Sequence, residues 1–85
     1  MVATPGKRSA VERSFERLYR RHVGEVYRYA MAVLASPADA EDVTQTTFLN
    51  AYNALHRGVS PRDPIEWLLA ITRNVCRDRF EEALP

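Results

Sequence analysis

One group of side chains in this sequence has the types and spacing that suit contact with nucleic acid. A helical projection of residues 65–80 gathers an aromatic ring, two guanidinium groups, an amide and a small residue on one side. Arginine neutralises phosphate or forks onto a guanine edge, asparagine pairs with adenine, and an aromatic face stacks an unpaired base. This group therefore predicts DNA or RNA contact, and its members are Trp67, Ala70, Arg73, Asn74 and Arg77.

The same residues also fit a purely structural role. Arg73 and Arg77 lie toward the C-terminal end of the expected helix, where the helix dipole favours cations. Trp67 can close the core in the way large aromatic side chains often do. Spacing alone leaves both roles open. The other side of this helix is expected to face the core through Ile65, Leu68, Leu69, Thr72, Val75 and Cys76.

A second group lies in the stretch SPADAEDVTQTTFLNAYNAL, residues 36–55, whose three carboxylates all fall in its first turns. Acids at a helix N-terminus stabilise the helix dipole by about 0.3–1 kcal/mol each, which by itself explains them. A helix that starts acidic and continues with neutral amides also suits a basic partner helix. A metal site is not expected, because the alternating oxygen ligands of a calcium loop are missing and no histidine stands one turn away.

The two faces of this acidic helix follow from the helical period. Its inward stripe is expected to contain Ala40, Val43, Thr47, Phe48, Ala51 and Leu55. Its exposed side is expected to contain Asp39, Asp42, Gln45, Thr46, Asn50 and Asn53. Residues 1–30 and 56–80 are basic on balance, so the change of sign along the chain indicates two different partners.

The elements that must hold these groups are helices throughout. The sequence lacks alternating β-branched runs and Asn-Gly or Asp-Gly hairpins, so we predict an all-α fold, a small helical bundle of three to four helices. The first helix is expected to follow Ser9, which caps it together with Glu12. Gly24 is the position where this helix can bend or break. A break at this position would divide the first helix in two and bring the number of helices to four.

The other two helices have clear starting signals. Ser36 with Pro37 begins a helix that is expected to run to about His56. Asp63 caps the last helix, with proline at its first position and Glu66 three residues after the cap, and this helix is expected to run to about Glu81. The loop HRGVSPRDP joins the two.

Composition bounds the class of protein. The 85 residues fit one domain, and 46% hydrophobic with 27% charged residues is typical of a folded globular chain. No apolar run approaches the length of a membrane span and no signal-peptide pattern is present, so we expect a cytoplasmic protein without membrane contact. Cys76 is the single cysteine and is expected to be a buried thiol. We predict no cofactor, a disordered tail over 1–8, a helical domain over 9–81 and the start of a linker over 82–85.

Three segments together resemble a known family, the region 2 domain of extracytoplasmic-function (ECF) sigma factors of bacterial RNA polymerase. FERLYRRHVGEVYRYA is similar to the region 2.1 pattern, DAEDVTQTTFLNAYNAL to region 2.2, and WLLAITRNVCRDRF to region 2.4. The segments occur in the family's order and at its typical separations. The resemblance covers about residues 14–80.

The resemblance implies a polymerase partner for the acidic helix. Region 2.2 of the family docks on the basic clamp-helix coiled coil of the β′ subunit, and its Asp-aliphatic-x-Gln pattern falls on Asp42, Val43 and Gln45. Thr46 departs from the acid that usually follows this glutamine, which implies weaker or differently tuned docking. The expected polymerase-binding residues are Asp39, Asp42, Gln45, Thr46 and Asn50.

The resemblance also implies a DNA partner for the last helix, the non-template strand of the minus-ten promoter element. The family pattern W-L-x-x-I-x-x-N falls on Trp67, Leu68, Ile71 and Asn74. The preceding loop, which captures a flipped base in the family, has no aromatic residue here. Ala70 with Arg73 is expected to read the upstream edge of the element. The expected DNA-binding residues are Arg57, Arg62, Trp67, Ala70, Arg73, Asn74 and Arg77.

The resemblance implies one further partner, and the residues leave other functions to weigh. An anti-sigma factor is an expected partner, and the region 4 that normally follows is not supplied after Phe80, so an excised domain is expected. The competing hypothesis is a protein-only helical adaptor or sigma-like decoy without a DNA role, and RNA binding stays open. An enzyme is not expected, because His22 and His56 lack a nearby nucleophile pattern and no phosphate loop occurs.

Overall fold

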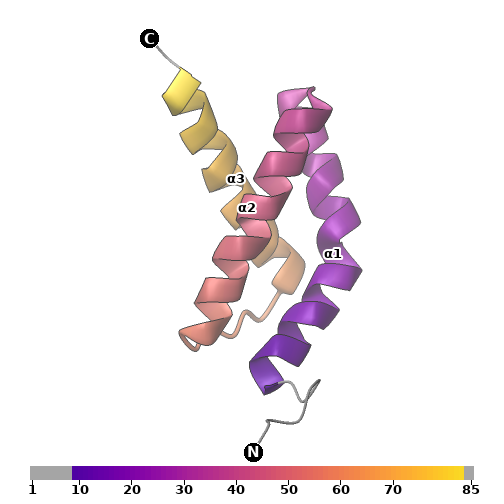
Figure 1. Ribbon diagram of the computed structural model, residues 1–85, viewed down its shortest axis with the longest axis vertical. Helices are drawn as coiled ribbons and strands as arrows, with labels where there is room; N and C mark the ends of the chain where they lie inside the picture. The colour runs from indigo at the N-terminus through magenta and orange to yellow at the C-terminus, as the bar shows by residue number, and fades with distance from the viewer. Residues whose placement is uncertain (1–8, 84–85) are drawn as a thin grey trace, which may run out of the picture.

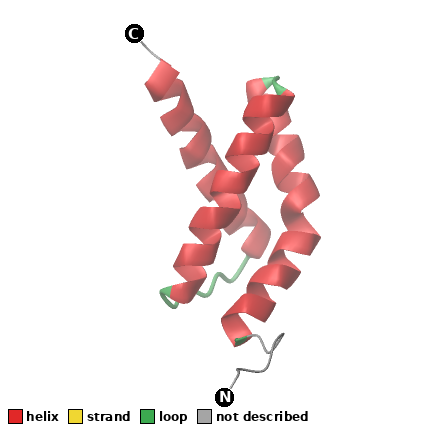
Figure 2. Ribbon diagram, viewed as in Figure 1, coloured by secondary structure: helices red, strands yellow, loops and turns green. Residues whose placement is uncertain are grey.

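Three helices pack together in the computed structural model, which describes residues 9–83. Helix α1 spans Ala10–Leu34, α2 spans Pro37–His56 and α3 spans Pro64–Ala83. Each helix runs roughly antiparallel to the one before it (Figure 1). Within the described residues the chain is helical apart from the two connections and the residue before α1 (Figure 2). The predicted all-α bundle is confirmed.

The number of helices is three because α1 passes through Gly24 without interruption. A glycine in a helix interior costs only about 1 kcal/mol relative to alanine, and tertiary packing of a long helix outweighs that cost. Helix α3 continues to Ala83, two residues beyond the predicted end at Glu81. The predicted tail over 1–8 and the last two residues of the predicted linker lie outside the described part of the chain.

Side-chain caps begin all three helices where the sequence predicts them. The Ser9 hydroxyl accepts from the Glu12 N–H at 3.1 Å, while the Glu12 carboxylate accepts from the Ser9 N–H at 3.3 Å. The Ser36 hydroxyl accepts from the Asp39 N–H at 3.3 Å, and the Asp63 carboxylate accepts from the Glu66 N–H at 3.3 Å. These bonds satisfy N–H groups that the first turn of a helix leaves without a partner.

The core consists of two apolar clusters, and each of them contains residues from all three helices. One contains Val26, Phe48, Ala51 and Leu68, and the other contains Ala30, Ala40, Val43 and Cys76. The buried hydroxyls of Thr47 and Thr72 bond to each other at 3.2 Å, and the Thr72 hydroxyl also donates to the Leu68 carbonyl. Buried polar groups are tolerated when they are hydrogen-bonded in this way, so the two threonines fix how α3 lies on α2.

The predicted inward stripe of α2 is confirmed except at one position. Leu55 is only half-buried and lines a pocket with Leu18 of α1 and with Val59 of the connecting loop. Ala54 and Thr44 are buried in its place, and Thr44 donates its hydroxyl to the Ala40 carbonyl at 2.7 Å. The helical period of 3.6 residues predicts which residues share a face, but it does not predict which residues at the edge of that face other segments of the chain will bury.

Candidate functional site

The exposed side of α2 carries an apolar residue between polar ones. Asp42, Gln45 and Thr46 are exposed as predicted, and Leu49, one turn further, has 59% of its surface exposed. Residues three and four apart in a helix are surface neighbours, so these four side chains form one continuous patch, which we call the α2 outer face. An exposed leucine that follows an acid and an amide along one helix face has the composition of a small protein-docking surface.

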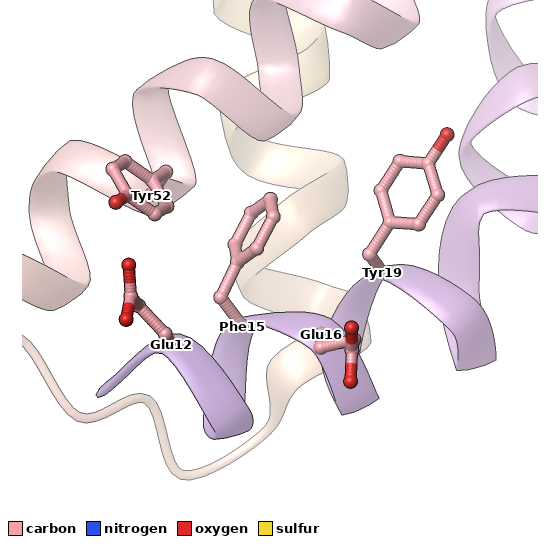
Figure 3. Close-up of a pocket in the computed structure, with 5 residues that line it drawn as sticks. All are labelled: Glu12, Phe15, Glu16, Tyr19 and Tyr52. Atoms are coloured by element: carbon pink, nitrogen blue, oxygen red, sulfur yellow. The ribbon is translucent and has the colours of Figure 1, made fainter. Parts of the chain in front are cut away.

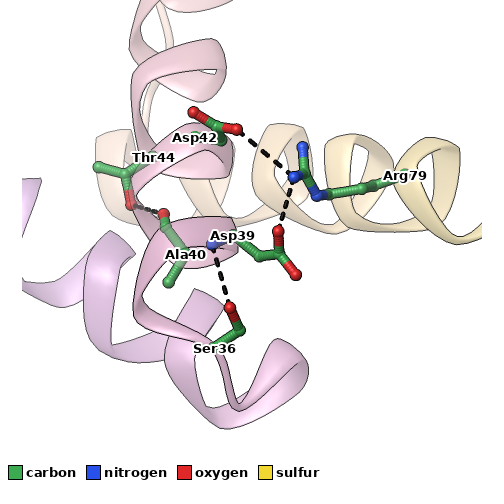
Figure 4. A network of polar contacts seen from close by, with 6 residues as sticks. All are labelled: Ser36, Asp39, Ala40, Asp42, Thr44 and Arg79. Atoms are coloured by element: carbon green, nitrogen blue, oxygen red, sulfur yellow. Dashed lines mark hydrogen bonds and ion pairs between the residues drawn. The ribbon is translucent and has the colours of Figure 1, made fainter.

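An arginine near the end of α3 clasps the acidic start of α2 (Figure 4). Arg79 Nη2 lies 2.6 Å from Asp39 Oδ1 and 3.4 Å from Asp42 Oδ2. Because α3 runs antiparallel to α2, its C-terminal turns reach the first turns of α2. The hydrogen bond that Arg79 donates to Asp39 raises the pKa of the Arg79 guanidinium above its ordinary value. Exposed pairs of this kind add little stability, so the main effect of the clasp is on the local charge.

The clasp treats the two predicted polymerase-binding acids differently. The Asp39 side chain is 43% exposed and bonded to Arg79 at the short distance, whereas the Asp42 side chain is 63% exposed and makes only the longer contact. Asp42 therefore keeps most of its carboxylate open to a partner, and Asp39 is largely engaged within the chain.

A groove of about 350 Å³ runs between α2 and α3. We call it the α2–α3 groove; its polar lining residues are Asn50, Arg57, Asn74 and Asp78, and Trp67 forms part of its apolar wall. The structure thus brings together three of the residues predicted to contact DNA. Asn50, predicted from the sequence to bind polymerase, lies in this groove as well. An amide there faces the same space as the asparagine of α3.

The remaining predicted DNA-binding residues lie around the groove or away from it. Arg73 and Arg77 are exposed on α3 next to Asn74, and Arg77 donates to the Asn74 side-chain oxygen at 2.9 Å. Arg62 is exposed in the connecting loop, and Ala70 is half-buried; neither of them lines the groove. Trp67 packs against the core cluster around Leu68, so only part of its ring is available for stacking.

A cleft of about 390 Å³ lies between α1 and α2, lined by Glu12, Phe15, Glu16, Tyr19 and Tyr52 (Figure 3). The rings of Phe15 and Tyr52 pack edge to face, with centroids 5.1 Å apart. Glu12 belongs to the cap of α1, and Glu16 pairs with Arg20 at 2.7 Å. The rings and acids that line this cleft already contact one another and neighbouring residues. These contacts stabilise the packing of α1 on α2.

Comparison with known proteins shows which family the chain belongs to. Residues 18–83 match the family described as Sigma-70 region 2. The chain belongs to this sigma factor family. Sigma factors are non-catalytic initiation factors, so the chain is not an enzyme. None of the described helices of this region 2 domain is both long and apolar enough to cross a bilayer.

Relatives of this region 2 domain are ECF sigma factors of bacteria. The chain is 36% identical over 74 residues to BldN of Streptomyces coelicolor, which covers 82% of the chain and 27% of BldN. It is 35% identical over 79 residues to SigE of Mycolicibacterium smegmatis, covering 85% of the chain and 30% of SigE. It is 31% identical over 84 residues to SigL of Mycobacterium tuberculosis, covering 98% of the chain and 48% of SigL.

The match is limited to one part of these sigma factors. The chain spans between 27% and 48% of the length of these three relatives. No solved structure matches the chain. The resemblance to an ECF region 2 domain, drawn from three sequence segments, is confirmed.

Three residues of this region 2 domain enter the site although the sequence did not single them out. Leu49 continues the three- and four-residue spacing of Asp42 and Gln45, so the helical spacing alone could have predicted that it lies on the same face. Arg79 and Asp78 are brought to the site by the packing of α3 on α2, which no local sequence pattern predicts.

Cys76 is 4% exposed as predicted, and burial raises the pKa of its thiol, which keeps it protonated and unreactive.

Proposed function

We propose that this region 2 domain acts in transcription initiation by docking on the β′ clamp helices of RNA polymerase and contacting the minus-ten element of promoter DNA. The observation that carries the first half is the α2 outer face, where an exposed leucine lies one turn beyond an amide and two turns beyond an open carboxylate. A basic partner helix complements each part of this patch. Asp42 pairs with a cation, Gln45 supplies directional hydrogen bonds, and Leu49 is buried on docking.

Thr46 tunes this docking. The family usually has an acid after the glutamine, and a hydroxyl there removes one attractive charge toward a basic coiled coil. Electrostatic complementarity acts mainly on the association rate and on specificity, so slower association is expected to be the principal consequence. The Arg79 clasp acts in the same direction, because it partly neutralises Asp42.

Leu49→Ala tests the apolar part of the proposal. This change should weaken binding to core RNA polymerase about tenfold, since burying a leucine side chain is worth about 1.5–3 kcal/mol and alanine retains only part of that. The readout is fluorescence anisotropy of the labelled domain titrated with sigma-free core polymerase. Val33→Ala, which trims a 40% exposed apolar side chain on α1, is the control and should bind like the parent. Unchanged binding by Leu49→Ala would exclude the α2 outer face as the docking surface.

The second half of the proposal concerns single-stranded promoter DNA. Arg73 and Arg77 are exposed side by side and suit phosphates of the non-template strand, and the α2–α3 groove next to them suits an unstacked base. Capture by aromatic stacking is restricted, because the loop has no aromatic residue and Trp67 packs on the core. Hydrogen bonds from the lining of the groove therefore replace stacking as the source of recognition.

A protein-only adaptor is the second candidate function. The packing of Trp67 against the core favours it, since this ring has a structural role without any DNA. The two candidates differ in whether the folded domain binds single-stranded DNA, which the experiment in the following section measures. On the basis of the family, we also propose a cytoplasmic location and an anti-sigma factor as a further partner.

A further inference from the structure

The end of the α2–α3 groove away from the connecting loop is lined by two amides and a carboxylate. Asn74 and Asp78 lie one turn apart on α3, and Asn50 faces the same groove from α2. In the part of the chain that the structure describes, no hydrogen bond or ion pair reaches the Asp78 carboxylate. The arginines beside this groove suit the phosphates of DNA, whereas the negative charge of Asp78 repels them. Binding of DNA here is therefore favoured only if a base of the strand donates hydrogen bonds to the Asp78 carboxylate.

The donors and acceptors at this end of the groove define what such a ligand must present. An ionised carboxylate only accepts, and its two oxygens take two neighbouring donors. The Asn74 side-chain oxygen already accepts from Arg77, so its NH₂ group is the part left to donate. The ligand must therefore offer two adjacent donors next to an acceptor.

The Watson–Crick edge of guanine has this pattern, with N1–H and N2–H beside O6. Thymine has one ring N–H, and the edges of cytosine and adenine each have a single donor group. We infer that Asp78 and Asn74 read an unpaired guanine of the bound strand, with the Asp78 carboxylate accepting from N1–H and N2–H and the Asn74 amide donating to O6. Arg73 and Arg77 hold the flanking phosphates.

This inference rests on the proposed contact with single-stranded DNA and adds a base preference to it. An extruded base exposes its Watson–Crick edge to protein groups, and each base edge is a distinct set of donors and acceptors. Bidentate hydrogen bonds to a charged group are the strong ones, so Asp78 is expected to set the preference and Asn74 to support it. Asp78 acts here as a specificity-determining residue.

The experiment measures binding of the 85-residue chain to fluorescein-labelled oligo-dT strands of about nine nucleotides by fluorescence anisotropy. The central nucleotide is dT, dC, dA, dG or deoxyinosine, which is guanine without its 2-amino group. The parent should bind the dG strand about tenfold more tightly than the dT strand, with deoxyinosine between them. Asp78→Asn should abolish the preference for dG. Glu81→Gln, which removes a carboxylate from an exposed position of the same helix, should keep it.

Each alternative result has a distinct meaning. Equal binding of all strands by the parent, or tighter binding of dA or dC than of dG, overturns the guanine assignment while leaving the DNA contact in place. If Asp78→Asn binds every strand more tightly by the same factor and still prefers dG, the carboxylate acts only through its charge and the inference is wrong. If no strand binds to a chain that circular dichroism shows to be helical, the proposed DNA contact fails, and the guanine assignment fails with it.

Discussion

Replacing Asp42 and Gln45 together with alanine should weaken binding of this domain to core RNA polymerase about 50-fold. Both side chains are exposed, and Asp42 makes only the 3.4 Å contact with Arg79, so neither is needed for the fold. A hydrogen bond to a charged group is worth about 1.5–3 kcal/mol and a neutral one about 0.5–1.5 kcal/mol, and together they amount to a loss of this size. The measurement is fluorescence anisotropy with sigma-free core polymerase.

The control for this double variant is Glu25→Ala, which removes an exposed carboxylate from α1 and changes the net charge by the same amount. It should bind like the parent. An equal loss in both variants would mean that the polymerase senses only net charge. The loss caused by the double variant should also shrink at high salt, because an exposed pair is screened over about 8–10 Å at moderate ionic strength.

Leu68→Ala should lower the free energy of unfolding by about 3 kcal/mol, measured by urea denaturation followed by circular dichroism. Leu68 is fully buried and packs between Val26 of α1 and the residues Phe48 and Ala51 of α2. Truncation of such a leucine removes apolar burial and leaves a cavity at the point where all three helices meet. Domains of this size bury a modest share of their surface, so the loss is a large part of the total stability.

The same leucine-to-alanine change at position 49 is the matched control for stability. Leu49 is 59% exposed, and its truncation should change the free energy of unfolding by less than about 0.5 kcal/mol. The two leucines therefore separate the two roles, since Leu68 supports the fold and Leu49 is proposed to support docking. A similar loss of stability in both variants would contradict the assignment of the core.

The helices and their starts could be predicted from the sequence because caps are local. Ser9, Ser36 and Asp63 bond to N–H groups three residues away, and such contacts depend only on the order of residue types. The buried side of α2 was predicted from its period for the same reason. Gly24 shows the limit of local rules, since its propensity favours a break that the packing of α1 on its neighbours overrides.

The site was predicted less completely, because its details come from how helices far apart in the sequence meet. The clasp between Arg79 and Asp39 joins residues forty positions apart and follows from the antiparallel packing of α3 on α2. Asn50 was grouped with the acidic helix by position, yet it lines the same groove as Asn74. Asp78 lies within the segment likened to region 2.4, but the matched pattern W-L-x-x-I-x-x-N does not include it, and only the packing of α3 on α2 places it in the groove.

The most direct test of the central claim is a heteronuclear NMR titration of the isotopically labelled chain with a β′ clamp-helix coiled-coil fragment. The account predicts that shift changes concentrate on Asp42, Gln45 and Leu49, with Arg73 and Asn74 unaffected, so that α3 stays free for DNA. Changes confined to α3, or no changes at fragment concentrations that saturate another sigma factor, would contradict it.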